Sequence, residues 1–126
     1  MSKIIWRSIA VLAMLGLGSA AMADHYVEVF TCTLEDDKTT DDVQAANSVW
    51  LAYVHENISE DITSSVVSSV VGDSSTFAFV DTYPDLDTWA RAKTRLDSDE
   101  ADELEDLFEG ILDCSENSLH KVTPTE

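Results

Sequence analysis

Basic residues are scarce in this chain. Its 126 residues include 25 Asp and Glu but only 7 Lys and Arg, which gives a formal net charge of −18. A field of this sign repels polyanions, so nucleic acid and anionic membrane surfaces are not expected as partners. We interpret the acidic balance as a solvated surface rather than as a site.

The signatures of several common catalytic and cofactor-binding classes are also missing. The sequence has no nucleophile elbow, phosphate-binding loop, dinucleotide-binding glycine motif or zinc-ligand spacing. His25, His55 and His120 are too scattered to suggest a metal site. We therefore expect neither a metal nor another cofactor, and no linker divides the chain.

The one long uncharged run is too short to cross a membrane. Two basic residues precede an uncharged stretch from Ser8 to Ala23, which falls short of the roughly 20 residues of a spanning helix. The stretch ends in Ala-Met-Ala, and this order is typical of a cleaved secretory signal peptide. We predict that residues 1–23 are removed. Residues 24–126 then form a single secreted or periplasmic domain without a stable membrane anchor.

The first half of that domain is predicted to begin with a strand and a helix. β-branched and aromatic residues from His25 to Leu34 predict the strand. Thr39, with Asp42 three residues on, offers an N-cap for a helix that ends near Asn57.

A β-hairpin and two helical segments are expected next. Residues 62–71 and 76–82, separated by a glycine-containing turn at 72–75, predict the hairpin. Pro84 ends the second of these strands, and a short helix follows through Trp89 and Lys93. After a break at Asp97, core-facing helical spacing is shown by Leu104, Leu107, Phe108, Ile111 and Leu112. A last strand is expected over about 118–123.

This order is β-α-β-β-α-β, with the second helical region split in two. It predicts an α+β fold of the ferredoxin-like kind, in which an antiparallel four-stranded sheet carries its helices on one face.

The only two cysteines agree with that topology. The end of the first strand lies beside the start of the fourth, and Cys32 and Cys114 fall near those two places. In an oxidising exterior we predict a Cys32–Cys114 disulfide. Closing a loop of about 80 residues would stabilise the domain by roughly 4 kcal/mol in the chain-entropy model. A redox-active pair is the alternative, although such pairs are usually Cys-x-x-Cys.

Both faces of the predicted sheet are apolar. One face carries the small residues Val27, Val29, Ala78 and Val80. The other carries Tyr26, Glu28, Phe30, Cys32, Phe77, Phe79 and Asp81. Because small residues suit close helix packing, we expect the helices on the first face and the aromatic face uncovered. An uncovered apolar face usually marks an interface, so we predict a homodimer through it.

The segment Val-Asp-Thr-Tyr-Pro-Asp-Leu-Asp-Thr-Trp-Ala, residues 80–90, resembles a passage in a known group. It is similar to the link between the third strand and second helix of the dimeric α/β-barrel superfamily. That superfamily includes the antibiotic-biosynthesis monooxygenase-like and stress-responsive barrel proteins. Monooxygenase-like members often carry a histidine on this helix, whereas residues 89–93 have none. The resemblance therefore implies the fold and a sheet-to-sheet dimer more than an oxygenase activity.

Two acids are the candidate catalytic residues. Glu28 and Asp81 lie on neighbouring predicted strands of the aromatic face. Burial would raise their pKa values, and two adjacent acids can divide into a protonated and an ionised member. The structural alternative is that they pair with Lys121 or with a hydroxyl group. The candidate ligand-binding residues around them are Tyr26, Phe30, Phe77 and Phe79.

Three of the few basic residues lie close together in the sequence, namely Arg91, Lys93 and Arg95. Asp87 and Asp99 stand four residues away from the two arginines, which favours a ladder of exposed i,i+4 ion pairs. An anchor for an anionic ligand is the other interpretation.

Two classes of function remain. We favour a non-catalytic exported dimer that binds a small apolar molecule or has an interaction or stress role. The alternative is a cofactor-independent barrel enzyme, monooxygenase- or isomerase-like, with Glu28 or Asp81 as acid or base.

Overall fold

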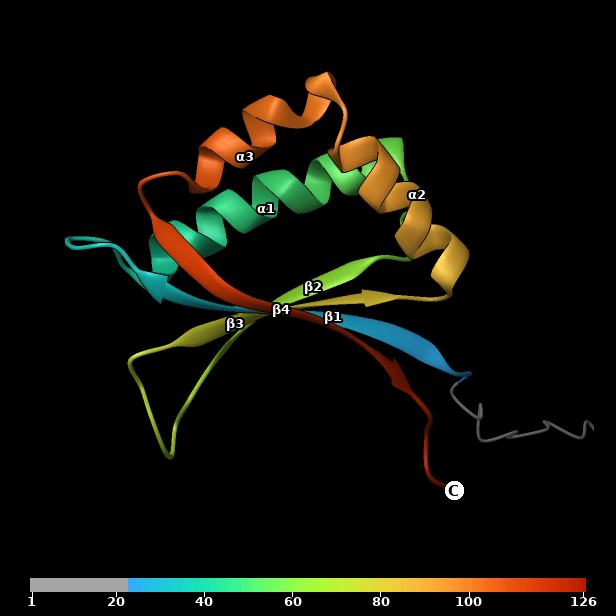
Figure 1. The fold of residues 1–126 in the computed structure, drawn as a ribbon, viewed down its shortest axis with the longest axis horizontal. Coiled ribbons are helices and arrows are strands. Elements are labelled where there is room, and N and C mark those ends of the chain that lie inside the picture. Colours follow the sequence, from blue (N-terminus) through green and yellow to red (C-terminus); the bar gives the residue numbers. More distant parts are fainter. Residues whose placement is uncertain (1–22) are drawn as a thin grey trace, which may run out of the picture.

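The computed structural model describes residues 23–126, so the predicted signal peptide lies outside the described residues except for Ala23. The predicted ferredoxin-like order β-α-β-β-α-β is confirmed, including the divided second helical region (Figure 1). The elements are β1 (His25–Leu34), α1 (Thr40–Asn57), β2 (Thr63–Ser68), β3 (Phe77–Tyr83), α2 (Leu86–Leu96), a 3-10 turn η1 (Asp99–Ala101), α3 (Asp102–Phe108) and β4 (Leu112–Val122).

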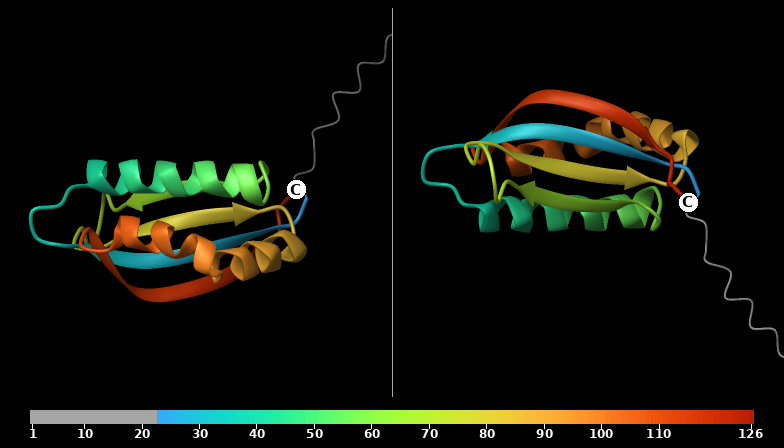
Figure 2. Two further views of the ribbon diagram at one scale, coloured as in Figure 1. Left: turned by 90° about the horizontal axis from the view of Figure 1, so that it is seen from above. Right: turned by 90° about the horizontal axis from the view of Figure 1, so that it is seen from below.

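The strands form one antiparallel sheet in the order β2-β3-β1-β4. All the helices lie on one side of it, and the opposite face is left bare by residues 23–126 (Figure 2). Within these residues, none of the helices has the length and apolar character that crossing a bilayer requires.

The first helix begins where the sequence predicts. The backbone N–H of Thr39 donates to Asp42 Oδ2 at 2.8 Å, and the backbone N–H of Asp42 donates to Thr39 Oγ1 at 3.4 Å. This capping box satisfies amide groups that a helix start leaves without partners. The same hydrogen bonds with Thr39 lower the pKa of Asp42. The helix then buries Val43, Ala46 and Val54 against the sheet.

The hairpin is wider than predicted. β2 ends at Ser68, which pairs with Phe77 at the start of β3, so residues 69–76 form a loop. Val70 and Val71, expected within the strand, are 98% and 92% exposed. The prediction was wrong here because β3 offers no residue before Phe77 for them to pair with, and β-propensity alone does not hold a strand.

The third helix is shorter than predicted and the fourth strand is longer. α3 ends at Phe108, and Gly110 follows with a φ of 79°. A left-handed residue is a common way to stop a helix, and the chain then enters β4 at Leu112 instead of near Ser118. Ile111 and Leu112 were placed on the helix because their spacing fits one. They pack on the same core cluster from the loop and from the strand.

The assignment of the two sheet faces was wrong. Phe77, Phe79 and Tyr83 are 6%, 7% and 1% exposed, and they lie beneath the helices. Val29 and Val80, which pair directly on β1 and β3, lie on the face without helices and are only half-buried. Large aromatic side chains gain more from complete burial than small ones.

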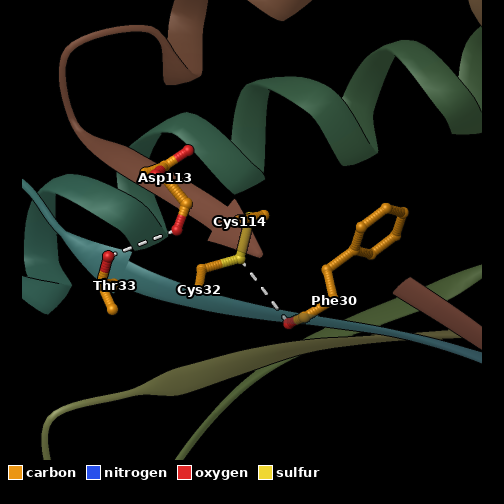
Figure 3. Close-up of a disulfide and its surroundings, with 5 residues drawn as sticks. All are labelled: Phe30, Cys32, Thr33, Asp113 and Cys114. Carbon is orange, nitrogen blue, oxygen red and sulfur yellow. Dashed lines mark hydrogen bonds between the residues drawn. A yellow bond between two sulfur atoms is a disulfide. The ribbon is translucent and has the colours of Figure 1, made fainter. Parts of the chain in front are cut away.

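The predicted disulfide between Cys32 and Cys114 is present. The two residues pair directly across β1 and β4, beside a bulge in the register, and they are 82 residues apart in the sequence. Cys114 lies within β4 and not just before it, because this strand begins early. Thr33 Oγ1 donates to the backbone carbonyl of Asp113 at 3.4 Å beside the bridge (Figure 3).

Candidate functional site

A cavity of about 330 Å³ lies between the inner face of the sheet and the helices. Most of its walls are aromatic or aliphatic, and a few polar groups interrupt them. The lining residues are Phe30, Asn47, Trp50, Phe79, Asp81, Tyr83, Lys93, Leu96, Glu105, Phe108, Leu112 and Cys114. Small-molecule sites in proteins have this character, with apolar walls and few polar groups, and begin at about 300 Å³.

A row of polar residues crosses the inner face of the sheet beside this cavity. Ser64 on β2 pairs with Asp81 on β3, and Asp81 pairs with Glu28 on β1. Directly opposed residues of antiparallel strands share a face, so the three side chains lie together. Asp81 is 5% exposed and Glu28 is 1% exposed.

Both oxygens of Glu28 are occupied by partners. Lys93 Nζ lies 2.6 Å from Oε1, and Trp89 Nε1 donates to the same oxygen at 3.3 Å. Asn117 Nδ2 on β4 donates to Oε2 at 3.0 Å. Trp89 and Lys93 are four residues apart on α2, so both reach the sheet from one side of that helix. Glu28 is therefore a buried counter-ion that attaches α2 to the sheet.

The carboxylate of Asp81 is only half occupied. Ser64 Oγ donates to Asp81 Oδ1 at 2.5 Å, and Asn47 Nδ2 on α1 donates to Ser64 Oγ at 2.9 Å. Within residues 23–126, Oδ2 accepts no hydrogen bond from a side chain, and no fully buried side-chain oxygen lacks a partner. Oδ2 is thus not fully buried, and Asp81 is one of the residues that line the cavity.

Burial raises the pKa of Asp81 from its ordinary 3.8 to about 6. The hydrogen bond from Ser64 and the charge of Lys93 oppose this shift, and the negative charge of Glu28 adds to it. Burial also raises the pKa of Tyr83, two residues along β3 on the same face, so this phenol stays protonated at neutral pH. The cavity therefore contains an acid that changes its protonation state close to neutrality.

The candidate residues predicted from the sequence separate into two groups. Phe30, Phe79 and Asp81 line the cavity, whereas Glu28 lies behind it as the partner of Lys93. Tyr26 and Phe77 pack in two different core clusters and do not line the cavity. Of the two pairings considered as the structural alternative, the one with a hydroxyl group is present, since Ser64 Oγ donates to Asp81. Lys121 pairs elsewhere, because its Nζ lies 3.3 Å from Asp24 Oδ2.

Several polar residues of the site were missed at the level of sequence. Asn47 stands four residues after Val43 and seven before Val54, so it lies within the apolar stripe of α1. A polar residue in this position indicates a buried polar contact, and the sequence could have revealed it. Ser64 carries no such signal, because serines recur throughout the second strand. The role of Lys93 depends on the direction in which α2 faces, and no local pattern specifies that.

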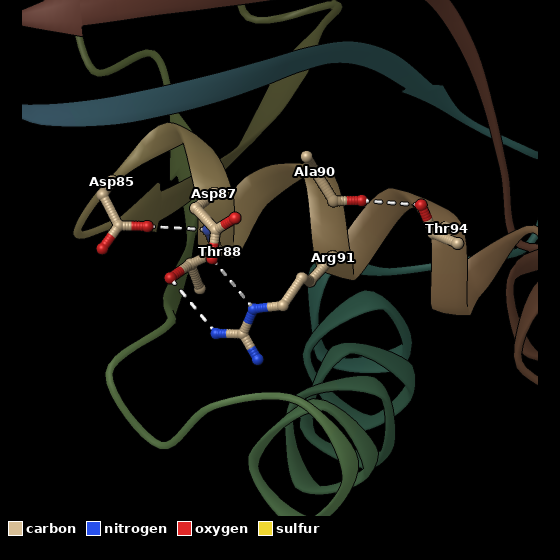
Figure 4. Close-up of polar contacts among 6 residues, drawn as sticks. All are labelled: Asp85, Asp87, Thr88, Ala90, Arg91 and Thr94. Atoms are coloured by element: carbon tan, nitrogen blue, oxygen red, sulfur yellow. Dashed lines mark hydrogen bonds and ion pairs between the residues drawn. The ribbon is translucent and has the colours of Figure 1, made fainter.

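The three basic residues of α2 have different partners. Arg91 Nε lies 3.4 Å from Asp87 Oδ2, as the i,i+4 spacing predicts, and Arg91 also reaches Thr88 (Figure 4). Arg95 pairs with Glu100 at 3.0 Å instead of Asp99, because the chain turns into η1 beyond the helix end. Lys93 does not belong to this exposed ladder, since it turns inward to Glu28.

The three histidines have separate hydrogen-bond partners. His55 Nε2 lies 2.6 Å from the carbonyl oxygen of Ile62, and His120 Nε2 lies 2.8 Å from Ser118 Oγ. In the part of the chain that the structure describes, no three His, Cys, Asp or Glu side chains gather in a way that could hold a metal ion.

No protein-family model matches the chain, and no curated protein matches it in sequence. Solved structures do match it. SnoaB, a cofactor-independent oxygenase from Streptomyces nogalater, is 12% identical, with 82% of this chain and 97% of that chain covered at a TM-score of 0.59. A second structure is that of a protein from Caulobacter crescentus CB15, provisionally assigned as an antibiotic biosynthesis monooxygenase. It is 11% identical, the match covers 84% of this chain and 94% of that chain, and the TM-score is 0.55.

The chain shares the ferredoxin-like fold of these two proteins. Sequence identities this low establish the fold and no activity. On that fold, this chain carries the Glu28–Lys93 pair, the hydrogen-bonded series from Asn47 through Ser64 to Asp81, and the Cys32–Cys114 disulfide.

Proposed function

We propose that the protein binds a small, largely apolar molecule in the cavity between the sheet and the helices. The observation that carries this proposal is an accessible carboxylate oxygen, Asp81 Oδ2, on a residue only 5% exposed among aromatic walls. A polar atom placed in this way supplies orientation to a ligand that the walls hold by apolar contact. Tyr83 supplies a second polar contact from the same strand.

Filling the cavity tests the proposal. Leu96 lines it from α2, whereas Leu86, on the same helix, does not line it and is 46% exposed. A panel of neutral, anionic and cationic single-ring compounds is titrated calorimetrically into the wild-type protein, the Leu96→Trp variant and the Leu86→Trp control. We expect at least one compound to bind the wild type and the control but not Leu96→Trp. Binding of no compound, or equal binding to both variants, contradicts a ligand site here.

The proposal includes export and dimerisation. Export is supported by the signal-peptide pattern over residues 1–23, and it accounts for an oxidised cysteine pair. Mass spectrometry of the secreted or periplasmic protein should give the mass of a chain that begins at Asp24. A mass that includes residues 1–23 would contradict the predicted cleavage. Dimerisation through the bare face of the sheet is supported by half-buried apolar side chains there, such as Val29 and Val80, which pair on the two middle strands.

A second candidate function is cofactor-independent proton transfer by Asp81. It is favoured by a pKa of about 6, which makes this carboxylate an effective base near neutrality. Glu28 is not part of this candidate, because its two oxygens are already paired.

The probe substrate 5-nitrobenzisoxazole measures such a base directly. A carboxylate removes its ring C–H proton while the N–O bond breaks, and a nitrile and a phenolate form. If Asp81 acts as a base, the rate rises with pH through about 6 and is lost in Asp81→Asn. A rate that is equal in the variant and the wild type contradicts catalysis by Asp81.

A further inference from the structure

The lining of the cavity carries a net negative charge, because its one positive charge is neutralised by an ion pair. Lys93 is the only basic residue in its lining, and its ammonium group is paired with Glu28 at 2.6 Å. Lys93 also lies 5.1 Å from the centroid of the Phe30 ring. The acids that remain in the lining are Asp81 and Glu105. The site therefore offers an excess of negative charge to a ligand.

The walls of the cavity suit a cation as well as an apolar group. The aromatic lining residues are Phe30, Trp50, Phe79, Tyr83 and Phe108. The rings of Phe79 and Phe108 meet edge to face at 5.7 Å. The faces of aromatic rings attract organic cations, and the attraction grows when the cation is removed from water.

Hydrogen bonds hold one oxygen of the Asp81 carboxylate and leave the other free. Ser64 holds Asp81 Oδ1 at 2.5 Å, and Asn47 holds Ser64 in turn at 2.9 Å. With one oxygen held in this way, Oδ2 accepts no hydrogen bond from residues 23–126, and Asp81 lines the cavity. A buried carboxylate without a full set of donors is costly. A ligand that brings a charged N–H group relieves this cost, and a neutral apolar ligand does not.

We propose that the natural ligand class is a small organic amine, bound with its ammonium group on Asp81 Oδ2 and its apolar body against the aromatic walls. This inference rests on the proposed ligand-binding function and specifies the ligand. The formal net charge of −18 favours it further, since an acidic protein raises the local concentration of cations.

The protonation state of Asp81 makes this inference testable by pH. The groups that face Asp81 are Glu28 of β1, Lys93 of α2 and Tyr83 of β3, with Glu105 of α3 in the same cavity wall. Among these influences burial dominates, and the pKa of Asp81 lies at about 6 in the free protein. An amine keeps its charge well above that pH. Amine binding is therefore strong above about pH 6 and is lost as Asp81 takes up a proton below it.

A matched pair of probes separates charge from shape. The wild-type protein is titrated calorimetrically with 2-phenylethylamine and with 2-phenylethanol at pH 8 and pH 5. We expect the amine to bind roughly tenfold or more tightly than the alcohol at pH 8, as a hydrogen bond between charged groups implies. At pH 5 the amine loses most of that advantage, while the affinity for the alcohol stays within about twofold.

The Asp81→Asn variant provides the second measurement. It should bind the amine at pH 8 roughly tenfold or more weakly than the wild type, and it should lose clearly less affinity for the alcohol, whose hydrogen bond to the side chain carries no charge. The control is Asp36→Asn, because Asp36 is exposed on the loop between β1 and α1 and does not line the cavity. It removes the same charge and should behave as the wild type.

The outcomes distinguish the two proposals. If neutral compounds bind in the cavity and the amine has no advantage at pH 8, the amine proposal is wrong while ligand binding stands. If no compound binds, both proposals are wrong. An amine advantage that persists at pH 5, or that Asp36→Asn removes as well as Asp81→Asn, shows that general surface charge is responsible and overturns the role of Asp81.

Discussion

Glu28 and Asp81 lie directly opposite each other on β1 and β3, yet their carboxylates have different environments. Glu28 has a lysine, a tryptophan and an asparagine as partners, whereas Asp81 has one serine and an oxygen open to the cavity. A pair of acids on one sheet face is thereby divided into a counter-ion of Lys93 and an acid that lines the cavity. Four measurable consequences follow from this pair and from the elements around it.

The stability of the protein should depend on pH through Asp81. The pKa of Asp81 is about 6 in the folded protein, against an ordinary value of 3.8. A raised pKa means that the folded state favours the protonated form. Its contribution to the free energy of unfolding is therefore complete below about pH 3.8 and is lost as the pH rises through about 6. The loss amounts to about 3 kcal/mol over that interval.

Urea unfolding of the wild type and of Asp81→Asn at several values between pH 4 and pH 7 measures this loss. The difference in unfolding free energy between the two proteins should fall as the pH rises. The Asp36→Asn variant should keep the slope of the wild type. Parallel pH profiles for the wild type and Asp81→Asn would contradict a raised pKa.

The ion pair between Lys93 and Glu28 should stabilise the fold. The Lys93→Met variant leaves the buried carboxylate of Glu28 without its cation, and it should lower the free energy of unfolding by about 3 kcal/mol. Arg91→Met is the matched control on the same helix. Arg91 pairs with Asp87 at the surface, so its loss should cost no more than about 0.5 kcal/mol. Equal effects of the two substitutions would contradict a buried counter-ion role.

The disulfide should carry a large share of the stability. Replacing both Cys32 and Cys114 by serine opens a covalent loop whose ends are 82 residues apart in the sequence, and it should cost roughly 4 kcal/mol in the chain-entropy model. Thermal unfolding with and without a reductant measures the cost. The double variant, which has no thiols, should not respond to the reductant. Two free thiols in the denatured, unreduced protein would refute the bond.

Dimerisation should depend on the bare face of the sheet. Val80→Lys places a charge at the centre of that face, opposite Val29, and should shift the protein from dimer to monomer. Val70→Lys is the control, because Val70 is 98% exposed on the hairpin loop. Light scattering after size-exclusion chromatography at micromolar concentration reads the mass of each protein. A monomeric wild type at this concentration would contradict the proposed interface.

Much of this fold is local and could be predicted from the sequence. The boundaries of β1 and α1 follow from a β-branched run and a capping box at Thr39 and Asp42, which depend on residues close in sequence. The order of elements then implies the topology. The topology implies that Cys32 and Cys114 meet, so a contact over a long sequence separation was predicted from local patterns.

The length of β4 and the end of β2 could not be predicted in that way. An apolar residue can reach the same core from a helix, a loop or a strand, as Ile111 and Leu112 show. Likewise Val70 and Val71 have strand propensity, but β3 offers them no partner.

The sequence by itself determined the order of elements, the alternation of side chains on each strand and the pairing of the cysteines, because these depend on local propensity and a single topology. Tertiary structure alone decided which apolar face the helices cover. Alternation of side chains defines the two faces of the sheet, but it does not specify which of them packs against the helices. That choice buried Glu28 and Asp81 beneath α1 and α2, brought Lys93 to one acid and left the other open to a cavity. The site therefore depends on packing between distant elements, which no local pattern encodes.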